Sequence, residues 1–175
     1  DVVVGNNEAL LNTPGILGQE VTGNVLKDFE VSDDQKEFTF YMREGLRWSD
    51  GEPVTVEDVR FAVEDFLFND ELTPIFPAWL RSGGRADGDI FEFEIVDDFC
   101  FKFKFTEPYG GLPLHLSIQG WKGYTDLLKP SHYLKQFHKD YADEEELEQA
   151  IKDADFGPGE WVNLFNQKDV TNWEL

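Results

Sequence analysis

Two short runs within residues 90–105 alternate apolar and charged side chains, which is the pattern of a β-hairpin with one buried face. In the first run the apolar positions alternate with Glu92 and Glu94, and in the second run they alternate with Lys102 and Lys104. The apolar positions are Phe91, Phe93 and Ile95, followed by Phe99, Phe101, Phe103 and Phe105.

The number of residues in the turn sets the register of this hairpin. A two-residue turn would place Glu94 opposite Phe101 and would mix the two faces. A three-residue turn, over residues 97–99, places Glu94 opposite Lys102. We expect the three-residue turn, because matched cross-strand pairs stabilise a sheet by roughly 0.2–1 kcal/mol each. The expected pairs are Glu94 with Lys102, Glu92 with Lys104, and Phe93 with Phe103.

An earlier hairpin and three helices are expected elsewhere. Alternating apolar residues on both sides of a turn at residues 32–35 predict a hairpin that contains Phe38, Phe40 and Met42. Thr55, followed by Asp58, is typical of a helix start and predicts a helix from about Val56 to Phe68. A short helix is expected from Pro130, and a further helix after Asp143 with Leu147, Ala150, Ile151 and Ala154 as its buried stripe. The hairpins and packed helices predict an α+β fold over 1–175, treated as a single domain, with a helical part at 108–175.

The charge balance excludes some partners. Asp and Glu number 36 and Lys and Arg number 15, so the formal net charge is −21. A negative field repels phosphate backbones, and we therefore expect no nucleic-acid partner. With Cys100 as the single cysteine, no internal disulfide is expected. Cys100 is expected on the outward face of its strand, as an inert thiol.

No pattern of catalytic or metal-binding residues is found. His132 and His138 are six residues apart, about 240° around a helix, so they cannot bind one metal from one face. Asp50 and Glu52 flank an Asp-Gly turn; a hydrolase that uses this carboxylate pair is a third hypothesis, weaker than a turn. We expect no enzyme activity, no cofactor and no metal.

The five tryptophans leave a binding alternative open. Trp79, Trp121 or Trp161 could form the aromatic platform of a carbohydrate-binding module. Such a platform requires coplanar, exposed tryptophans, whereas a protein that uses them in its core buries them.

The signature region, residues 29–59, is more specific. Its sequence through Asp58 is FEVSDDQKEFTFYMREGLRWSDGEPVTVED, with Gly45, Trp48, Asp50-Gly51, Pro53 and Thr55 at characteristic spacing. It resembles the family 5 extracellular solute-binding proteins, the oligopeptide-, dipeptide- and nickel-binding receptors of ABC importers. Shorter matches follow at Glu107-Pro108-Tyr109 and Pro130-Ser131-His132-Tyr133.

The resemblance implies a fold and a function. It implies an N-terminal-half fragment, most of a subdomain of the first lobe in a two-lobed, class II periplasmic-binding-protein-like fold. The parent would bind a solute, expected to be an oligopeptide, in an interlobe cleft and would deliver it to ABC permease subunits. The remaining lobe of the parent is then a further partner, and the expected location is extracytoplasmic, either periplasmic or as a lipid-anchored lipoprotein.

The resemblance also implies a candidate contact with the solute. In peptide-binding members, an aromatic residue in the loop after the first helix contacts ligand, and Phe76 or Trp79 is the nearest match here. Prolines at positions 74 and 77 hold this loop extended, so residues 73–80 are expected on the cleft-facing side.

Overall fold

The computed structural model describes residues 9–13, 20–117 and 126–154. The chain divides into two compact units, residues 1–130 and residues 131–175, and each is treated separately here. The first unit contains both expected hairpins and the first helix, and the second contains the later helices. The α+β class is therefore confirmed.

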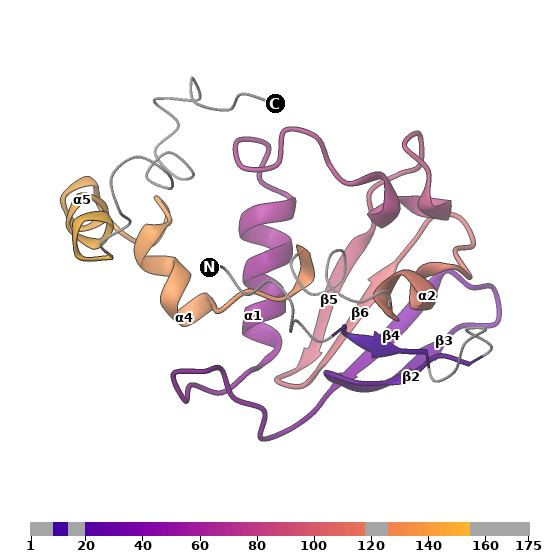
Figure 1. The fold of residues 1–175 in the computed structure, drawn as a ribbon. Helices are drawn as coiled ribbons and strands as arrows, with labels where there is room; N and C mark the ends of the chain where they lie inside the picture. Colours follow the sequence, from indigo (N-terminus) through magenta and orange to yellow (C-terminus); the bar gives the residue numbers. More distant parts are fainter. Residues whose placement is uncertain (1–8, 14–19, 118–125, 155–175) are drawn as a thin grey trace. The chain divides into compact units, whose positions relative to one another are not determined.

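A four-stranded antiparallel sheet forms the centre of the first unit, in the order β3-β4-β6-β5 (Figure 1). The strands are β3 (Leu26–Val31), β4 (Glu37–Met42), β5 (Glu92–Asp97) and β6 (Cys100–Lys104). A short antiparallel ladder of β1 (Leu11–Asn12) and β2 (Thr22–Gly23) precedes it. The two expected hairpins thus share one sheet, because β4 pairs with β6.

The β5–β6 hairpin has the predicted register. Glu94 lies opposite Lys102, and the other two expected pairs also form. The extra residue, however, lies within the strand and not in the turn: the register shifts between Ile95 and Asp97, where Val96 forms a bulge, and Asp97 pairs with Cys100. A bulge adds one residue to one strand and therefore preserves the same facing pairs as a longer turn would.

One face of this sheet is aromatic and the other is charged. Phe38, Phe40, Phe101 and Phe103 are at most 2% exposed and form the core, whereas Phe99 is only half-buried. Lys102 and Lys104 lie on the opposite face, as expected. Cys100 also lies on that face, as expected, but it is only 6% exposed, and the sequence pattern did not predict this burial.

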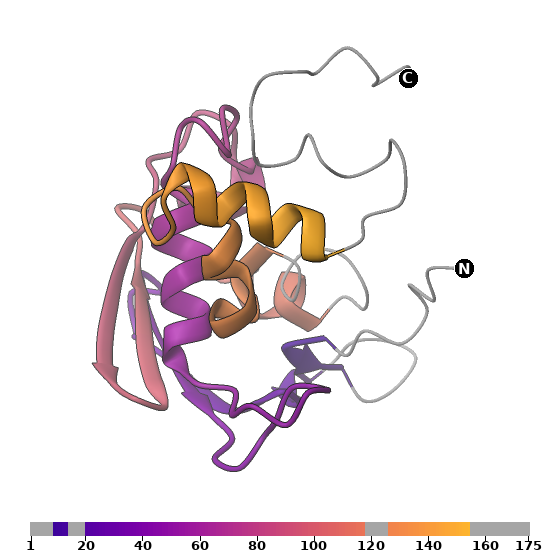
Figure 2. The ribbon, with the colours of Figure 1, turned by 90° about the vertical axis from the view of Figure 1, so that its left-hand side faces the viewer.

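The first helix begins at Val56, as the sequence predicts. The Thr55 hydroxyl accepts a hydrogen bond from the Glu57 amide, and the Asp58 carboxylate accepts one from the Thr55 amide at 3.0 Å. This capping box satisfies amides that the first turn leaves without helical partners. Figures 1 and 2 show α1 (Val56–Arg60) and its continuation against one face of the sheet.

The continuation, η2 (Phe61–Leu67), is π-helical, which the sequence did not predict. At its end the Phe68 amide donates to the Val63 carbonyl five residues back, at 2.9 Å. The wider spacing also brings Asp65, five residues after Arg60, to 3.2 Å from the Arg60 guanidinium. Arg60 therefore bonds three carboxylates, those of Glu57, Glu64 and Asp65.

Short elements connect and follow the sheet. They are η3 (Ala78–Leu80), η4 (Ser82–Gly84) and α2 (Leu112–Ser117) in the first unit, and α4 (Ser131–Leu134), η5 (Lys135–Phe137) and α5 (Glu144–Asp153) in the second. Asp143 caps α5 as predicted, through the amides of Glu145 and Glu146. The apolar stripe of α5 has the expected spacing but is half-buried, not buried. No helix in the described ranges is long and apolar enough to span a bilayer.

Candidate functional site

The segment of residues 73–80, between η2 and the end of η3, carries both candidate site residues. Phe76 is 8% exposed and Trp79 is 7% exposed, and both belong to the core of the first unit. Ile75, between Pro74 and Phe76, is 86% exposed. The loop therefore turns its two large rings inward and leaves one aliphatic side chain in solvent.

Polar contacts hold Trp79 in the core at both its indole and its backbone. The indole Nε1 donates to the Asp126 carboxylate at 3.1 Å, and the Tyr109 hydroxyl donates to the Trp79 carbonyl at 2.6 Å. The His115 ring lies 6.0 Å from the Trp79 ring. Burial raises the pKa of Tyr109 to about 12, which keeps its hydroxyl a donor at neutral pH.

Phe76 packs at the edge of the aromatic core. Its ring centroid is 6.1 Å from those of Phe68 and Phe91, and the Arg81 guanidinium lies 5.3 Å above its face. Both rings thus have partners within the first unit and offer little free surface. Their role in binding stays a prediction. Ile75 is the side chain of the loop that the sequence analysis did not single out, and its position between Pro74 and Pro77, next to a core-directed Phe76, was the available signal.

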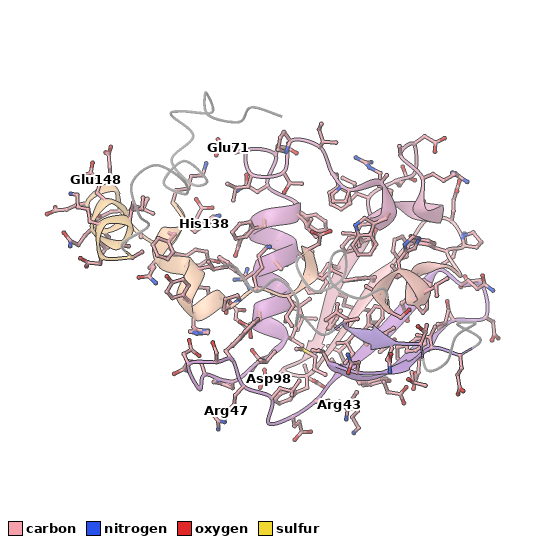
Figure 3. All side chains as sticks on the ribbon, in the orientation of Figure 1. Arg43, Arg47, Glu71, Asp98, His138 and Glu148 are labelled. Carbon is pink, nitrogen blue, oxygen red and sulfur yellow. The ribbon has the colours of Figure 1, made fainter. Side chains whose placement is uncertain are left out.

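A hollow of about 570 Å³ lies at the end of the sheet where β5 turns into β6. Asp28, Glu44, Asp97, Asp98 and Lys27 line it with charged groups, and Tyr41 and Cys100 contribute from β4 and β6. Figure 3 labels Asp98 at this end of the molecule. Sequence reasoning missed the hollow, because its walls come from three separate stretches of chain that only the sheet brings together.

The thiol of Cys100 is the buried polar group of this hollow. Burial raises its pKa, and the nearby Asp97 carboxylate raises it further, while Lys102 acts in the opposite direction. The thiol is therefore protonated at neutral pH, which agrees with the expectation of an inert thiol.

The other carboxylates and histidines singled out from sequence have local partners. The Asp50 carboxylate accepts the Glu52 amide at 3.1 Å, as in a turn, and both residues are exposed and outside the hollow. His138 is 2% exposed, and its Nδ1 accepts the Asp140 amide at 3.3 Å at the end of η5. In the described ranges no three His, Cys, Asp or Glu side chains are arranged to hold a metal ion.

One of the three tryptophans considered for a carbohydrate-binding platform is excluded by its burial. Trp79 is buried, so it cannot present an open face to a sugar, and Trp121 and Trp161 lie outside the described residues. Trp48 is half-buried and its indole donates to Asp58 at 3.1 Å.

The arrangement of sheet and helices matches solved proteins of one class. The oligopeptide-binding protein OppA superposes with a TM-score of 0.67 over 93% of this chain and 23% of its own, at 33% identity. The periplasmic binding protein MelB from Agrobacterium fabrum C58, solved with stachyose, gives 0.63 over 85% of this chain and 22% of its own, at 22% identity. The fold is that of a part of a two-lobed periplasmic binding protein.

The sequence narrows this class to one family. Residues 20–162 match the bacterial extracellular solute-binding proteins, family 5, and the chain belongs to this family. Similar proteins include the probable D,D-dipeptide-binding periplasmic protein DdpA of Escherichia coli K12, 40% identical over 102 residues. The periplasmic alpha-galactoside-binding protein of Rhizobium meliloti strain 1021 is 29% identical over 119 residues. The match to DdpA includes 58% of this chain but only 18% of DdpA. The match to the alpha-galactoside-binding protein includes 68% of this chain but only 16% of that protein.

Proposed function

We propose that this chain forms part of the first lobe of an ABC-importer receptor that binds oligopeptides in an interlobe cleft. The observation that carries the proposal is the match to OppA, which combines 33% identity with 93% coverage of this chain. DdpA and a probable peptide ABC transporter periplasmic-binding protein of Sinorhizobium fredii, 34% identical over 91 residues, support a peptide as the solute.

A second solute class has its own support. The match to the alpha-galactoside-binding protein covers 68% of this chain, compared with 58% for DdpA and 51% for the Sinorhizobium fredii protein. An oligosaccharide is therefore the alternative solute, bound in the same cleft and not on a tryptophan platform.

The partners and location follow from the same family. The parent protein would release its solute to ABC permease subunits and would act outside the cytoplasm, in the periplasm or tethered by a lipid. Its function would be transport and not catalysis, in agreement with a family of solute-binding proteins.

Residues 73–80 remain the proposed solute-facing loop. Phe76 and Trp79 would contribute ring edges, since each is less than a tenth exposed, and Ile75 would contribute most of the apolar surface. The contacts of Trp79 with Asp126 and Tyr109 would hold the loop in place while a solute binds.

The test compares the longer parent protein with this chain alone. Calorimetry with mixed tri- to pentapeptides, and separately with stachyose, should detect micromolar binding of peptides by the parent. A one-lobed chain leaves much of a ligand in water, so we expect it to bind no tighter than roughly millimolar, about −4 kcal/mol. Binding of stachyose but not peptides by the parent would overturn the peptide assignment, and micromolar peptide binding by this chain alone would overturn the two-lobed site.

A further inference from the structure

Arg81 directly follows the proposed solute-facing loop, and its guanidinium lies against that loop. The guanidinium carbon is 5.3 Å from the centre of the Phe76 ring, over its face, and Nη1 donates to the Gly88 carbonyl at 3.0 Å. The backbone is held as well, because the Arg81 amide donates to the Ala78 carbonyl at 3.1 Å and the residue forms a β-bridge with Ile90. The charge of Arg81 is therefore held in a defined place beside the loop.

Among the described residues, no carboxylate pairs with this guanidinium. Two acidic residues, Asp87 and Asp89, flank the carbonyl that Arg81 binds, but both are engaged elsewhere. Asp87 pairs with Arg85 at 3.3 Å. Asp89 accepts a hydrogen bond from the Thr106 hydroxyl at 2.8 Å. The half-buried guanidinium of Arg81 therefore has a neutral carbonyl as its acceptor, although carboxylates lie close to it in the sequence.

The other arginines of the chain differ from Arg81 in exposure or in partner. Arg60, also half-buried, bonds three carboxylates, and the exposed Arg85 bonds two. Arg43 and Arg47 donate to backbone carbonyls, as Arg81 does, but both are exposed to water. Removal of a charge from water is costly unless an opposite charge offsets it, so arginine is rarely buried without one. Within the described residues, Arg81 is the arginine that combines partial burial with the lack of an anionic partner.

The donors that remain on Arg81 suit a carboxylate. Nη1 is used by Gly88, whereas Nε and Nη2 make no hydrogen bond to any described residue. These two nitrogens form one edge of the planar guanidinium and can donate two parallel hydrogen bonds to one carboxylate. A singly charged carboxylate is favoured over a phosphate, because the field of a chain with a net charge of −21 repels anions in proportion to their charge.

We propose that Arg81 binds a carboxylate of the solute through its Nε–Nη2 edge, with the Phe76 ring beside the guanidinium. The inference rests on the proposed function, since it takes residues 73–80 as the solute-facing loop, and it narrows the class of solute. A peptide can supply this carboxylate from its C-terminus or from an acidic side chain. Stachyose has no carboxylate, so Arg81 favours a peptide over a neutral oligosaccharide.

The test measures binding of four matched tripeptides to the longer parent protein by calorimetry. Ala-Leu-Ala is compared with its C-terminal amide, and the amide of Ala-Glu-Ala is compared with the amide of Ala-Gln-Ala. The peptides of each pair differ in one carboxylate, which is at the C-terminus in the first pair and on the side chain in the second. For the wild type, we expect the carboxylate to strengthen binding about tenfold or more in one of the pairs, and that pair identifies its source.

Three variants assign the carboxylate preference to Arg81. Arg81→Gln should remove it, so that the two peptides of the pair bind within about twofold of each other. Arg81→Lys keeps the charge but lacks the edge of two nitrogens, and should retain only part of the preference. The matched control Arg47→Gln removes an exposed arginine that also donates to a backbone carbonyl, and should retain all of it. Because the preference is a ratio of two affinities of the same variant, a general loss of affinity or stability cancels.

The outcomes separate this inference from the proposed function. Loss of the preference in Arg81→Gln and not in Arg47→Gln supports the carboxylate site. Peptide binding with no carboxylate preference in the wild type, or with the same preference in Arg81→Gln, would overturn the inference and leave the proposed function intact. Equal loss in Arg81→Gln and Arg47→Gln would also overturn it, since the overall charge and not a local contact would then set the preference. Binding of stachyose and of none of the four peptides would overturn the proposed function and the inference together.

Discussion

Lys104 forms its ion pair with Glu94, although Glu92 is the residue directly opposite it on β5. Lys102 likewise pairs with Glu37 on β4, at 2.8 Å, and not with Glu94 across from it. The backbone register is the predicted one, but the long lysine side chains bond diagonally. The hydrogen bond from Lys104 lowers the pKa of Glu94 below its usual value.

The two faces of the sheet should contribute unequally to stability. Phe103 is fully buried, with its ring 4.4 Å from that of Phe91, so Phe103→Ala should lower the free energy of unfolding by about 3–5 kcal/mol. Lys102→Ala removes only a partly exposed ion pair with Glu37, and its effect on the free energy of unfolding should be much smaller. Urea unfolding of both variants checks this, and comparable losses would contradict it.

Substitution of Gly84 by alanine should destabilise the fold more than substitution of Gly45, because a side chain at Gly84 would also meet Tyr109. Both have positive φ, +68° and +82°, so alanine strains the backbone at either position by about 1 kcal/mol. A Cβ at Gly84 would also lie 2.8 Å from the Tyr109 hydroxyl, whereas Gly45 has open space around it. Gly84→Ala should therefore lower the free energy of unfolding clearly more than Gly45→Ala, and equal losses would show that Tyr109 moves aside freely.

Tyr109 should make the protein less stable at high pH. Its pKa is about 12 in the folded protein, above the ordinary value of 10, so the unfolded chain releases this proton first. The stabilisation is full below about pH 10 and is lost as the pH rises through about 12. The difference in unfolding free energy between wild type and Tyr109→Phe, measured from pH 9 to 11.5, should shrink with pH, and a constant difference would contradict this.

Salt should stabilise the fold. A net charge of −21 repels itself more strongly in the compact state than in the unfolded state. Raising NaCl from about 20 mM to about 1 M shortens the screening length to roughly 3 Å and should raise Tm by several degrees. Sucrose at matched osmolality is the control, and an equal rise in both would assign the effect to solvent exclusion and not to screening.

The parts of the fold that the sequence predicted correctly depend on interactions between residues close together in the sequence. The pairing of Glu94 with Lys102 and the helix start at Thr55 each follow from residues only a few positions apart. The bulge at Val96 preserves the same pairs as a longer turn, so the sequence pattern could not distinguish the two.

The candidate site was predicted less well, because burial depends on distant partners. Trp79 is buried by Tyr109 and Asp126, which lie 30 and 47 residues away along the chain. Cys100 is buried although it is on the charged face of the sheet, and alternation alone does not reveal this. The hollow beside it required knowledge of the order of the strands.

The π-helical segment η2 has a consequence for tolerance to length changes. Each of its hydrogen-bonded rings holds one residue more than an α-helical ring, so the helix behaves as an α-helix with one residue inserted. Deletion of exposed Glu64 would let the segment relax to ordinary α-helix while Leu67 and Phe68 keep their approximate directions. Single-residue deletions usually disrupt a helix, but this helix contains a position where one can be accommodated. The ion pair that is lost is the one between Arg60 and Glu64, since Asp65 moves into the i+4 position relative to Arg60.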